Sequence, residues 1–252
     1  MNITAVQNYN LYSKQCNPNF KANNRKIIDK ATGNVYKTTT YFFREDLNWD
    51  GFVKLLDNKY KDTLKVNVYN DACSGGHEPV SLAIKLKQRM GKRADKFFPI
   101  HASDYNPTNI KNAKAGIMGI KNEELYRINE ETNNRYRDYF SFAPRTNFCD
   151  DLALSPKGDL SKNIEYKQGD IFKNIEQMPS SNTVLLCRNF WRYLPEDGNN
   201  AEKLAQKLGE KLDSSSLVVI GEHDGECNTK GLLEKYGFEE TPVQYVFQKR
   251  GK

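Results

Sequence analysis

The sequence lacks the features that mark membrane, secreted and zinc-binding proteins. No apolar run approaches the ~20 residues that cross a bilayer, and the N-terminus has no apolar core of signal-peptide length. Five scattered cysteines without a C-x-x-C pair, beside only three histidines, argue against a disulfide framework and a structural zinc site. The sequence therefore predicts a cytoplasmic protein with no membrane insertion and no bound metal.

Signals for nucleic acid and for pyrophosphate are also missing. The net charge of +6 is modest for 252 residues, and no stripe of clustered basic and aromatic residues is present. There is no N-P-P-aromatic motif, and the glycine-rich turn at residues 72–76 has neither a Walker lysine nor the G-x-G-x-x-G spacing. These absences disfavour a nucleic-acid partner and a dinucleotide cofactor.

Strand and helix patterns alternate from residue 64 onward. The stretches expected as strands are 64–73, 97–105, 163–172, 181–189, 215–224 and 243–250. The stretches expected as helices are 41–60, 78–90, 106–116, 130–140, 199–213 and 228–238. This order predicts an α/β fold, with a doubly wound, mostly parallel sheet, helices on both faces and a closing antiparallel strand.

Two regions stand outside the regular alternation. Residues 1–37 are polar and rich in asparagine and lysine, and they predict a short N-terminal extension ahead of a single domain over residues 38–252. Residues 117–163 predict one helix, near 130–140, and otherwise loops or short strands. The helix at 106–116 has clearer ends, because Asn106 suits an N-cap and Gly116 suits a C-terminal stop.

The turn "ACSGG" follows the first strand of the predicted sheet. Gly75 and Gly76 have no β-carbon, so a ligand could lie directly on the backbone there. Asp104 ends the second strand, where a carboxylate can accept hydrogen bonds from ribose hydroxyls. A nucleoside site without a pyrophosphate signature favours S-adenosylmethionine. The alternative for Asp104 is a cap on the helix that starts near Pro107.

Five segments, in order, resemble the CheR-type family of chemotaxis-receptor glutamate methyltransferases. They are "TTTYFFRE", "ACSGGHEPVSLA", "HASDYNPTNIKNAKAGIM", "LLCRNFWRYLPED" and "LVVIGEHD", and the match covers roughly residues 36–250. The resemblance implies a Rossmann-like class I methyltransferase sheet that binds S-adenosylmethionine and releases S-adenosylhomocysteine. It also implies O-methylation of a glutamate in an acceptor protein such as a chemoreceptor.

The resemblance implies eight cofactor-binding residues. They are Ala72, Ser74, Gly76, Glu78, Asp104, Asp170, Ile171 and Asn189. The first three would shape the turn around the methionine part, and Glu78 would face its ammonium. Asp104 would hold the ribose, Asp170 and Ile171 would flank the adenine, and Asn189 would lie beside the methionine end.

The resemblance also implies two catalytic residues, Arg44 and Tyr193, which would border the transferred methyl and the incoming acceptor. A glutamate is ionised at neutral pH, with a reference pKa of about 4.3, so the reaction needs no strong base. Two plainer roles remain open. Arg44 could pair with Glu45 or Asp46 at the surface, and Tyr193 could be a core aromatic.

Some residues depart from the family pattern. His77 replaces the first glutamate of E-E-P and is expected to be an exposed loop residue, and Asp170 replaces an asparagine. Cys73 and Cys187 are expected to pack beneath the site. The small β-insert with which some members tether receptors would fall within 140–163, where no clear strand pair is evident.

Two alternatives to protein methylation follow from these departures and from the short segment of about 37 residues ahead of "FFR", where the family usually has a docking domain. One is a methyltransferase that acts on a small molecule. The other is a catalytically silent module that binds S-adenosylmethionine.

Overall fold

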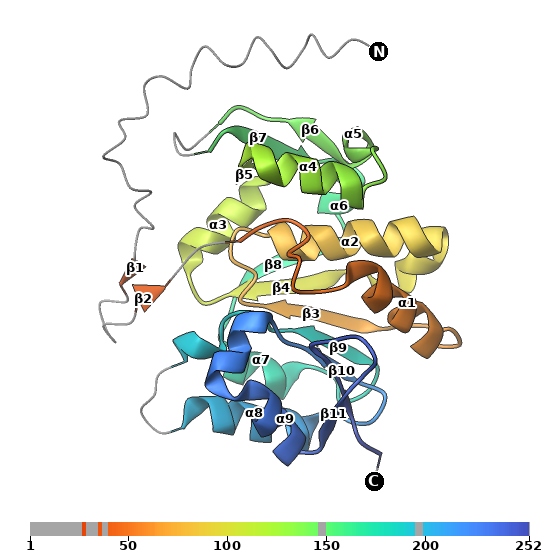
Figure 1. Cartoon of the computed structure of the whole chain (residues 1–252), viewed down its shortest axis with the longest axis vertical. Coiled ribbons are helices and arrows are strands. Elements are labelled where there is room, and N and C mark those ends of the chain that lie inside the picture. Colours follow the sequence, from red (N-terminus) through yellow and green to blue (C-terminus); the bar gives the residue numbers. More distant parts are fainter. Residues whose placement is uncertain (1–26, 29–34, 37–39, 146–149, 195–198, 252) are drawn as a thin grey trace.

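A seven-stranded sheet forms the centre of the domain (Figure 1). The structure, a computed structural model, describes residues 27–28, 35–36, 40–145, 150–194 and 199–251. The strands are β3 (Asn67–Asp71), β4 (Ile100–Asp104), β8 (Ile164–Gln168), β9 (Thr183–Leu186), β10 (Leu217–Val219), β11 (Phe238–Glu240) and β12 (Val246–Lys249). Their order is β11-β12-β10-β9-β3-β4-β8.

The predicted sheet topology is confirmed. Strands β10, β9, β3, β4 and β8 are parallel, and β12 pairs antiparallel with β10 as the expected closing strand. One further strand, β11, pairs antiparallel with β12 and lies in the region expected to be the last helix and its exit. That helix is shorter than expected, because it ends ahead of Gly237, which adopts a φ of 88°.

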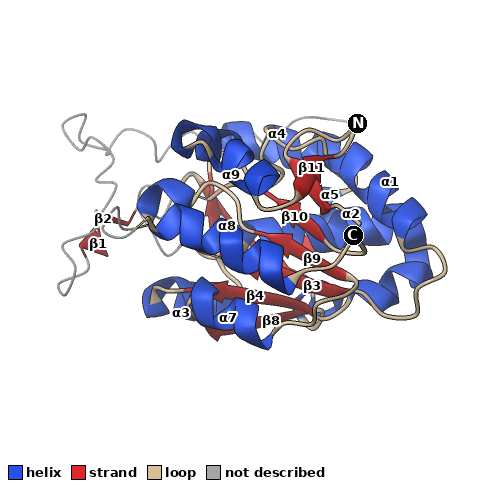
Figure 2. Ribbon diagram, turned by 90° about the horizontal axis from the view of Figure 1, so that it is seen from below, coloured by secondary structure: helices blue, strands red, loops and turns tan. Residues whose placement is uncertain are grey.

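Helices cover both faces of the sheet, as Figures 1 and 2 show. They include α1 (Trp49–Lys59), α2 (His77–Met90), α3 (Pro107–Ala115), α7 (Ile171–Gln177), α8 (Asn200–Lys211) and α9 (Thr229–Lys235). Alternate strand residues enter separate cores, because side chains alternate across a strand. Val184 and Leu186 pack with α1 and α2, whereas Leu185 packs with α7, α8 and α9.

Local signals set the helix ends near the sheet. Gly76 is the N-cap of α2 and has a left-handed φ of 88°, and Pro79 lies in the first turn of the helix, where proline is tolerated. Asn106 caps α3 by accepting a hydrogen bond from the Thr108 amide, and Gly116 ends it in the left-handed region. The two predicted ends of α3 are therefore confirmed.

Residues 117–163 differ from the prediction. They contain α4 (Asn122–Glu131), α5 (Tyr136–Tyr139), α6 (Gly158–Ser161) and an antiparallel sheet of β5 (Met118–Ile120), β6 (Phe140–Phe142) and β7 (Leu152–Pro156) in the order β5-β7-β6. A strand pair is thus present within 140–163, and the expectation of none was wrong. The expected helix at 130–140 is broken because Asn133 and Asn134 adopt positive φ, which asparagine tolerates.

The N-terminal region is described only in part. Backbone pairing joins β1 (Ile27–Ile28) to β2 (Val35–Tyr36) in an antiparallel pair. The rest of the expected extension over 1–37 lies outside the described residues. Among the helices that are described, none combines the length and apolar character required to span a membrane.

Candidate active site

The predicted site residues gather at one edge of the main sheet. Because β9, β3, β4 and β8 are parallel, the segments that follow their carboxyl ends are neighbours. Nine of the ten predicted residues lie there, namely Ala72, Ser74, Gly76, Glu78, Asp104, Asp170, Ile171, Asn189 and Tyr193. The tenth, Arg44, precedes α1 in a segment that contacts the same edge through Asp46.

The turn between β3 and α2 has an unusual backbone. Ala72, Ser74 and Gly76 have φ values of 60°, 49° and 88°, so two non-glycine residues occupy the left-handed region. Such conformations persist only where the surroundings enforce them. Here the Cys73 amide donates to the Ser103 carbonyl at 2.8 Å, and the Ser74 amide donates to Asp104 Oδ2 at 2.8 Å. The neighbouring strand therefore fixes the shape of the turn.

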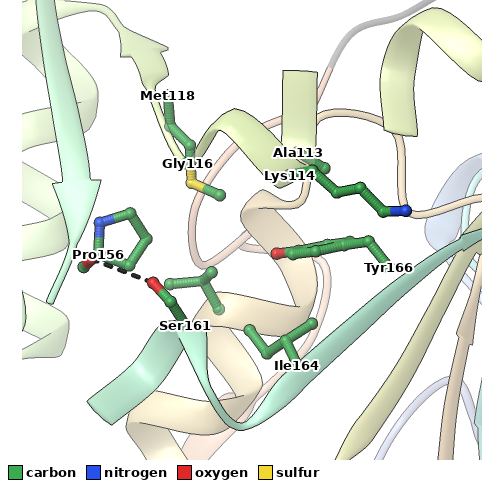
Figure 3. Close-up of a pocket in the computed structure, with 9 residues that line it drawn as sticks. Ala113, Lys114, Gly116, Met118, Pro156, Ser161, Ile164 and Tyr166 are labelled. Atoms are coloured by element: carbon green, nitrogen blue, oxygen red, sulfur yellow. Dashed lines mark hydrogen bonds between the residues drawn. The ribbon is translucent and has the colours of Figure 1, made fainter. Parts of the chain in front are cut away.

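Gly76 lies directly against Tyr166 of β8. A β-carbon at Gly76 would come within 2.7 Å of Tyr166 Oη, and the hydroxyl is 3.5 Å from the Gly76 carbonyl oxygen. Tyr166 also lines a cavity of about 270 Å³, which Met118, Ser161 and Ile164 border as well (Figure 3). The side chain that packs against Gly76 therefore also borders open space.

Asp104 is 8% exposed and accepts three hydrogen bonds. Oδ2 binds the Ser74 amide, while Oδ1 binds the Asn106 amide at 2.9 Å and Asn109 Nδ2 at 3.1 Å. Burial raises its pKa, although these hydrogen bonds oppose the rise. Because Asn106 caps α3, Asp104 is not that helix's N-cap, so this alternative is wrong.

Glu78 belongs to a buried cluster of charges that the sequence did not reveal. Its Oε1 accepts from Asn70 Nδ2 at 2.7 Å, and its Oε2 pairs with Arg188 Nη1 at 2.6 Å. Arg188 Nη2 pairs with Asp46 Oδ1 at 2.5 Å, and the guanidinium lies 5.5 Å from the Trp49 ring centroid. Arg188 immediately precedes Asn189 in the C-R-N motif, so this motif could have identified Arg188 as a site residue.

Asn189 has a φ of 58° and is held by protein groups. Its amide donates to Asp224 Oδ2 at 2.7 Å, and its side chain donates to Asp46 Oδ2 at 3.2 Å. Asp224 is fully buried, and burial raises its pKa to about 6 despite three backbone hydrogen bonds. A β-carbon at Gly221 would fall 2.2 Å from Asn189 Oδ1, so a glycine is required beside this side chain.

Arg44 and Tyr193 are both partly exposed. The Arg44 guanidinium lies 5.4 Å from the Tyr41 ring centroid, while its acidic neighbours Glu45 and Asp46 pair with Arg127 and Arg188. Tyr193 lies in a short 3-10 helix with Trp191, and it is Trp191, 1% exposed, that enters the core. The Arg44 charge nevertheless helps to lower the pKa of Asp46, so the surface-pair role for Arg44 stays open, whereas the partly exposed Tyr193 does not fit the core role.

Asp170 and Ile171 start α7 beyond β8. Asp170 is the N-cap of α7 and accepts from the Phe172 amide at 2.9 Å. One turn later, Asn174 donates to Asp71 Oδ1 at 2.7 Å, and Ser103 donates to the same oxygen. Burial raises the pKa of Asp71 to about 6. Asp71 was not predicted as a site residue, although it immediately precedes the turn.

His77 is buried, with 6% of its surface exposed, so the expectation of an exposed loop residue was wrong. Its ring lies 4.6 Å from the Phe42 ring, and Nε2 is 3.3 Å from the Gly119 carbonyl oxygen of β5. Burial lowers its pKa to about 4. Cys73 and Cys187 are also buried, as expected, and burial raises both thiol pKa values.

Comparisons with known proteins agree with the resemblance. The family model described as "CheR methyltransferase, SAM binding domain" matches residues 38–239. A chemotaxis protein methyltransferase of Listeria monocytogenes is 26% identical over 197 residues, covering 77% of this chain and 68% of that protein. One of Borreliella burgdorferi is 25% identical over 228 residues, covering 82% and 74%. A precorrin-6y C5,15-methyltransferase structure from Geobacter metallireducens covers 84% of this chain and 93% of its own, with a TM-score of 0.39 and 11% identity.

Proposed function

The chain belongs to the CheR methyltransferase family and uses S-adenosylmethionine, and we propose that it methylates a glutamate side chain in an acceptor protein. The observation that carries the proposal is the arrangement around the β3–α2 turn. A backbone of small residues, fixed by Asp104, lies between two carboxylates, Glu78 and Asp104, at the carboxyl edge of the sheet. The names of the relatives support a protein acceptor.

The residues at this edge suit a cationic nucleoside. The described hydrogen bonds of Asp104 use three of the roughly four lone-pair sites of a carboxylate, which leaves acceptor capacity for a ribose hydroxyl. In the described structure Asn70 Oδ1 is buried without a protein partner, next to the Glu78 carboxylate. These two acceptors fit an ammonium group, and the start of α7 at Asp170 and Ile171 would border the adenine.

When bound, S-adenosylmethionine would supply an electrophilic methyl group for transfer to a carboxylate oxygen, with a neutral thioether as the leaving group. The protein needs to orient the acceptor and exclude water, and such positioning can contribute ~7–11 kcal/mol in well-oriented systems. Arg44 would hold the acceptor carboxylate by a bidentate contact. Tyr193 would border the methyl group. No base is required, which is consistent with His77 being buried and neutral.

The three-stranded sheet β5-β7-β6 is our candidate for acceptor docking. Its strands β6 and β7 lie within 140–163, where the resemblance places the receptor-tethering insert of some family members, and β5 lies ahead of that range. Its order makes β6 an edge strand, and Phe142 of β6 is 55% exposed. An edge strand offers unpaired backbone groups to an extended segment of a partner.

A methyl-transfer assay tests the proposal. Labelled S-adenosylmethionine is mixed with glutamate-rich helical peptides and with matched glutamine peptides, and base-labile methyl esters are measured as released methanol. We expect label only in the glutamate peptides. Label confined to small molecules would favour the small-molecule alternative, and cofactor binding without any turnover would favour the silent module.

Arg44→Ala tests the catalytic assignment. Because Arg44 is proposed to touch the acceptor, we expect turnover to fall by at least about tenfold while S-adenosylhomocysteine affinity stays within a few-fold. The control is Arg93→Ala, which removes an exposed arginine paired with Asp57 on α1 and should change neither quantity. Equal loss of turnover and affinity in Arg44→Ala would move this residue to the cofactor side.

A further inference from the structure

Arg188 is shared by two carboxylates, and this sharing affects the charge at the cofactor edge. Its guanidinium pairs with Glu78 on one side and with Asp46 on the other. The side chains of Arg188, Asp46 and Glu78 are 1%, 9% and 13% exposed. One positive charge therefore faces two negative charges in a region from which water is largely excluded, where charges interact strongly.

Asp46 has further contacts that keep it ionised and in place. Its Oδ2 accepts from the Glu222 amide at 3.0 Å and from Asn189 Nδ2 at 3.2 Å. Burial raises the pKa of Asp46, but Arg188, these two hydrogen bonds and Arg44 outweigh burial, and the pKa lies below its usual value. Asp46 is therefore a fixed negative charge that joins the segment before α1 to the ends of β9 and β10.

We propose that Asp46 is a positioning residue for the amino-acid end of the cofactor, acting through Arg188 on Glu78. Asp46 takes up part of the Arg188 charge, so that Glu78 keeps enough negative charge to attract the ligand ammonium. This inference rests on the proposed role of Glu78. Without the Asp46 charge, Arg188 would neutralise Glu78 almost completely, and the site would bind the adenosyl part as before but the ammonium less well.

Two ligands separate these contributions. S-adenosylhomocysteine carries the amino-acid end, whereas 5′-methylthioadenosine has the same adenosyl thioether without it. Calorimetry on Asp46→Asn should show S-adenosylhomocysteine affinity reduced about tenfold, the effect of weakening one buried charge contact, while 5′-methylthioadenosine affinity changes less than about twofold. The ratio of the two dissociation constants is unaffected by a fraction of unfolded protein, because unfolding lowers both affinities equally.

The matched control is Asp57→Asn, which removes another carboxylate that pairs with arginines, on α1 and away from the turn. For this control, the ratio of the dissociation constants of S-adenosylhomocysteine and 5′-methylthioadenosine should equal that of the wild-type protein. Equal weakening of both ligands by Asp46→Asn would show a merely structural role and overturn the proposal, as would an unchanged ratio. Glu78→Gln should change the ratio in the same direction as Asp46→Asn, and if it does not, the relay through Glu78 is wrong. A wild-type protein that binds neither ligand would instead contradict the proposed function.

Discussion

Gly76→Ala is the substitution that tests the cofactor turn most directly. The residue has a φ of 88°, and a left-handed conformation costs a non-glycine residue ~1–2 kcal/mol. The added methyl would also meet Tyr166 Oη at 2.7 Å and two ring carbons at 3.1 Å. Overpacking costs ~1–3 kcal/mol, and the lower end applies here because Tyr166 borders a cavity into which it can shift. We therefore expect the free energy of unfolding to fall by roughly 2–3 kcal/mol.

The two contributions can be separated with a second substitution. Tyr166→Phe removes the atom closest to the new methyl. Alone it should lower the free energy of unfolding only slightly, because the hydroxyl lies 3.5 Å from the Gly76 carbonyl oxygen and this hydrogen bond is weak. In the double variant the closest contact is gone although the two ring carbons remain, so most of the steric part should be relieved and the combined loss should be about 1 kcal/mol smaller than the sum of the single losses. The backbone part of ~1–2 kcal/mol should remain.

Urea denaturation of the four proteins measures this cycle, and calorimetry with S-adenosylhomocysteine measures the turn itself. Because the turn is proposed to touch the cofactor, Gly76→Ala should weaken binding, and Tyr166→Phe should restore part of the affinity in the double variant. Additivity of the two unfolding losses within ~0.3–0.5 kcal/mol would refute the steric argument. Unchanged binding by Gly76→Ala would refute the placement of the cofactor on this turn.

Two further predictions concern buried carboxylates. Asp104→Ala should lower S-adenosylhomocysteine affinity by at least about tenfold in calorimetry, because it removes the proposed ribose acceptor and releases the Ser74 amide. Unchanged affinity would place the ribose elsewhere. Burial raises the pKa of Glu124 from its ordinary 4.5 to about 7, so the folded state holds a proton that the unfolded state releases. The free energy of unfolding should therefore fall as pH rises from about 4.5 to 7. In Glu124→Gln this pH-dependent decrease should be smaller by up to roughly 3 kcal/mol, as measured by urea titrations. Parallel pH profiles of the two proteins would contradict this pKa.

The parts of the fold that were predictable are those with local signals. The helix α3 is flanked by an asparagine cap and a glycine stop, and three of the four residues of β9 are apolar. The sheet β5-β7-β6 has no such signal, because β6 has three residues, two of them exposed, and its partner β7 begins ten positions after β6 ends. Pairing of this kind depends on tertiary packing, which overrides weak strand propensity.

The candidate site was predictable in position but not in its internal contacts. The resemblance implied ten site residues, and the parallel sheet brings nine of them to one edge. It did not reveal that Glu78 pairs with Arg188, or that Asp46 pairs with Arg188 across 142 positions of sequence. His77 was misjudged for a similar reason, since its burial arises from Phe42 and from β5, two segments remote from it in the chain.

The segment that carries Arg44 is held from two sides, which suits the catalytic role proposed for its partly exposed side chain. On one side, the Glu124 carboxylate of α4 accepts from the Phe42 amide at 2.6 Å, and Arg127 of α4 pairs with Glu45 at 2.7 Å. On the other, Asp46 pairs with Arg188 at the sheet edge.

Between these anchors, the Arg44 carbonyl accepts from Trp49 Nε1 at 3.1 Å, while its guanidinium stays partly exposed beside Tyr41. Phe42 and Phe43 are fully buried and fix the backbone on which Arg44 stands. A catalytic group works best when its backbone is rigid and its head can reach the substrate. The position of Arg44 is therefore set jointly by α4, which directly follows β5 of the three-stranded sheet, and by the buried charges beneath the proposed cofactor site.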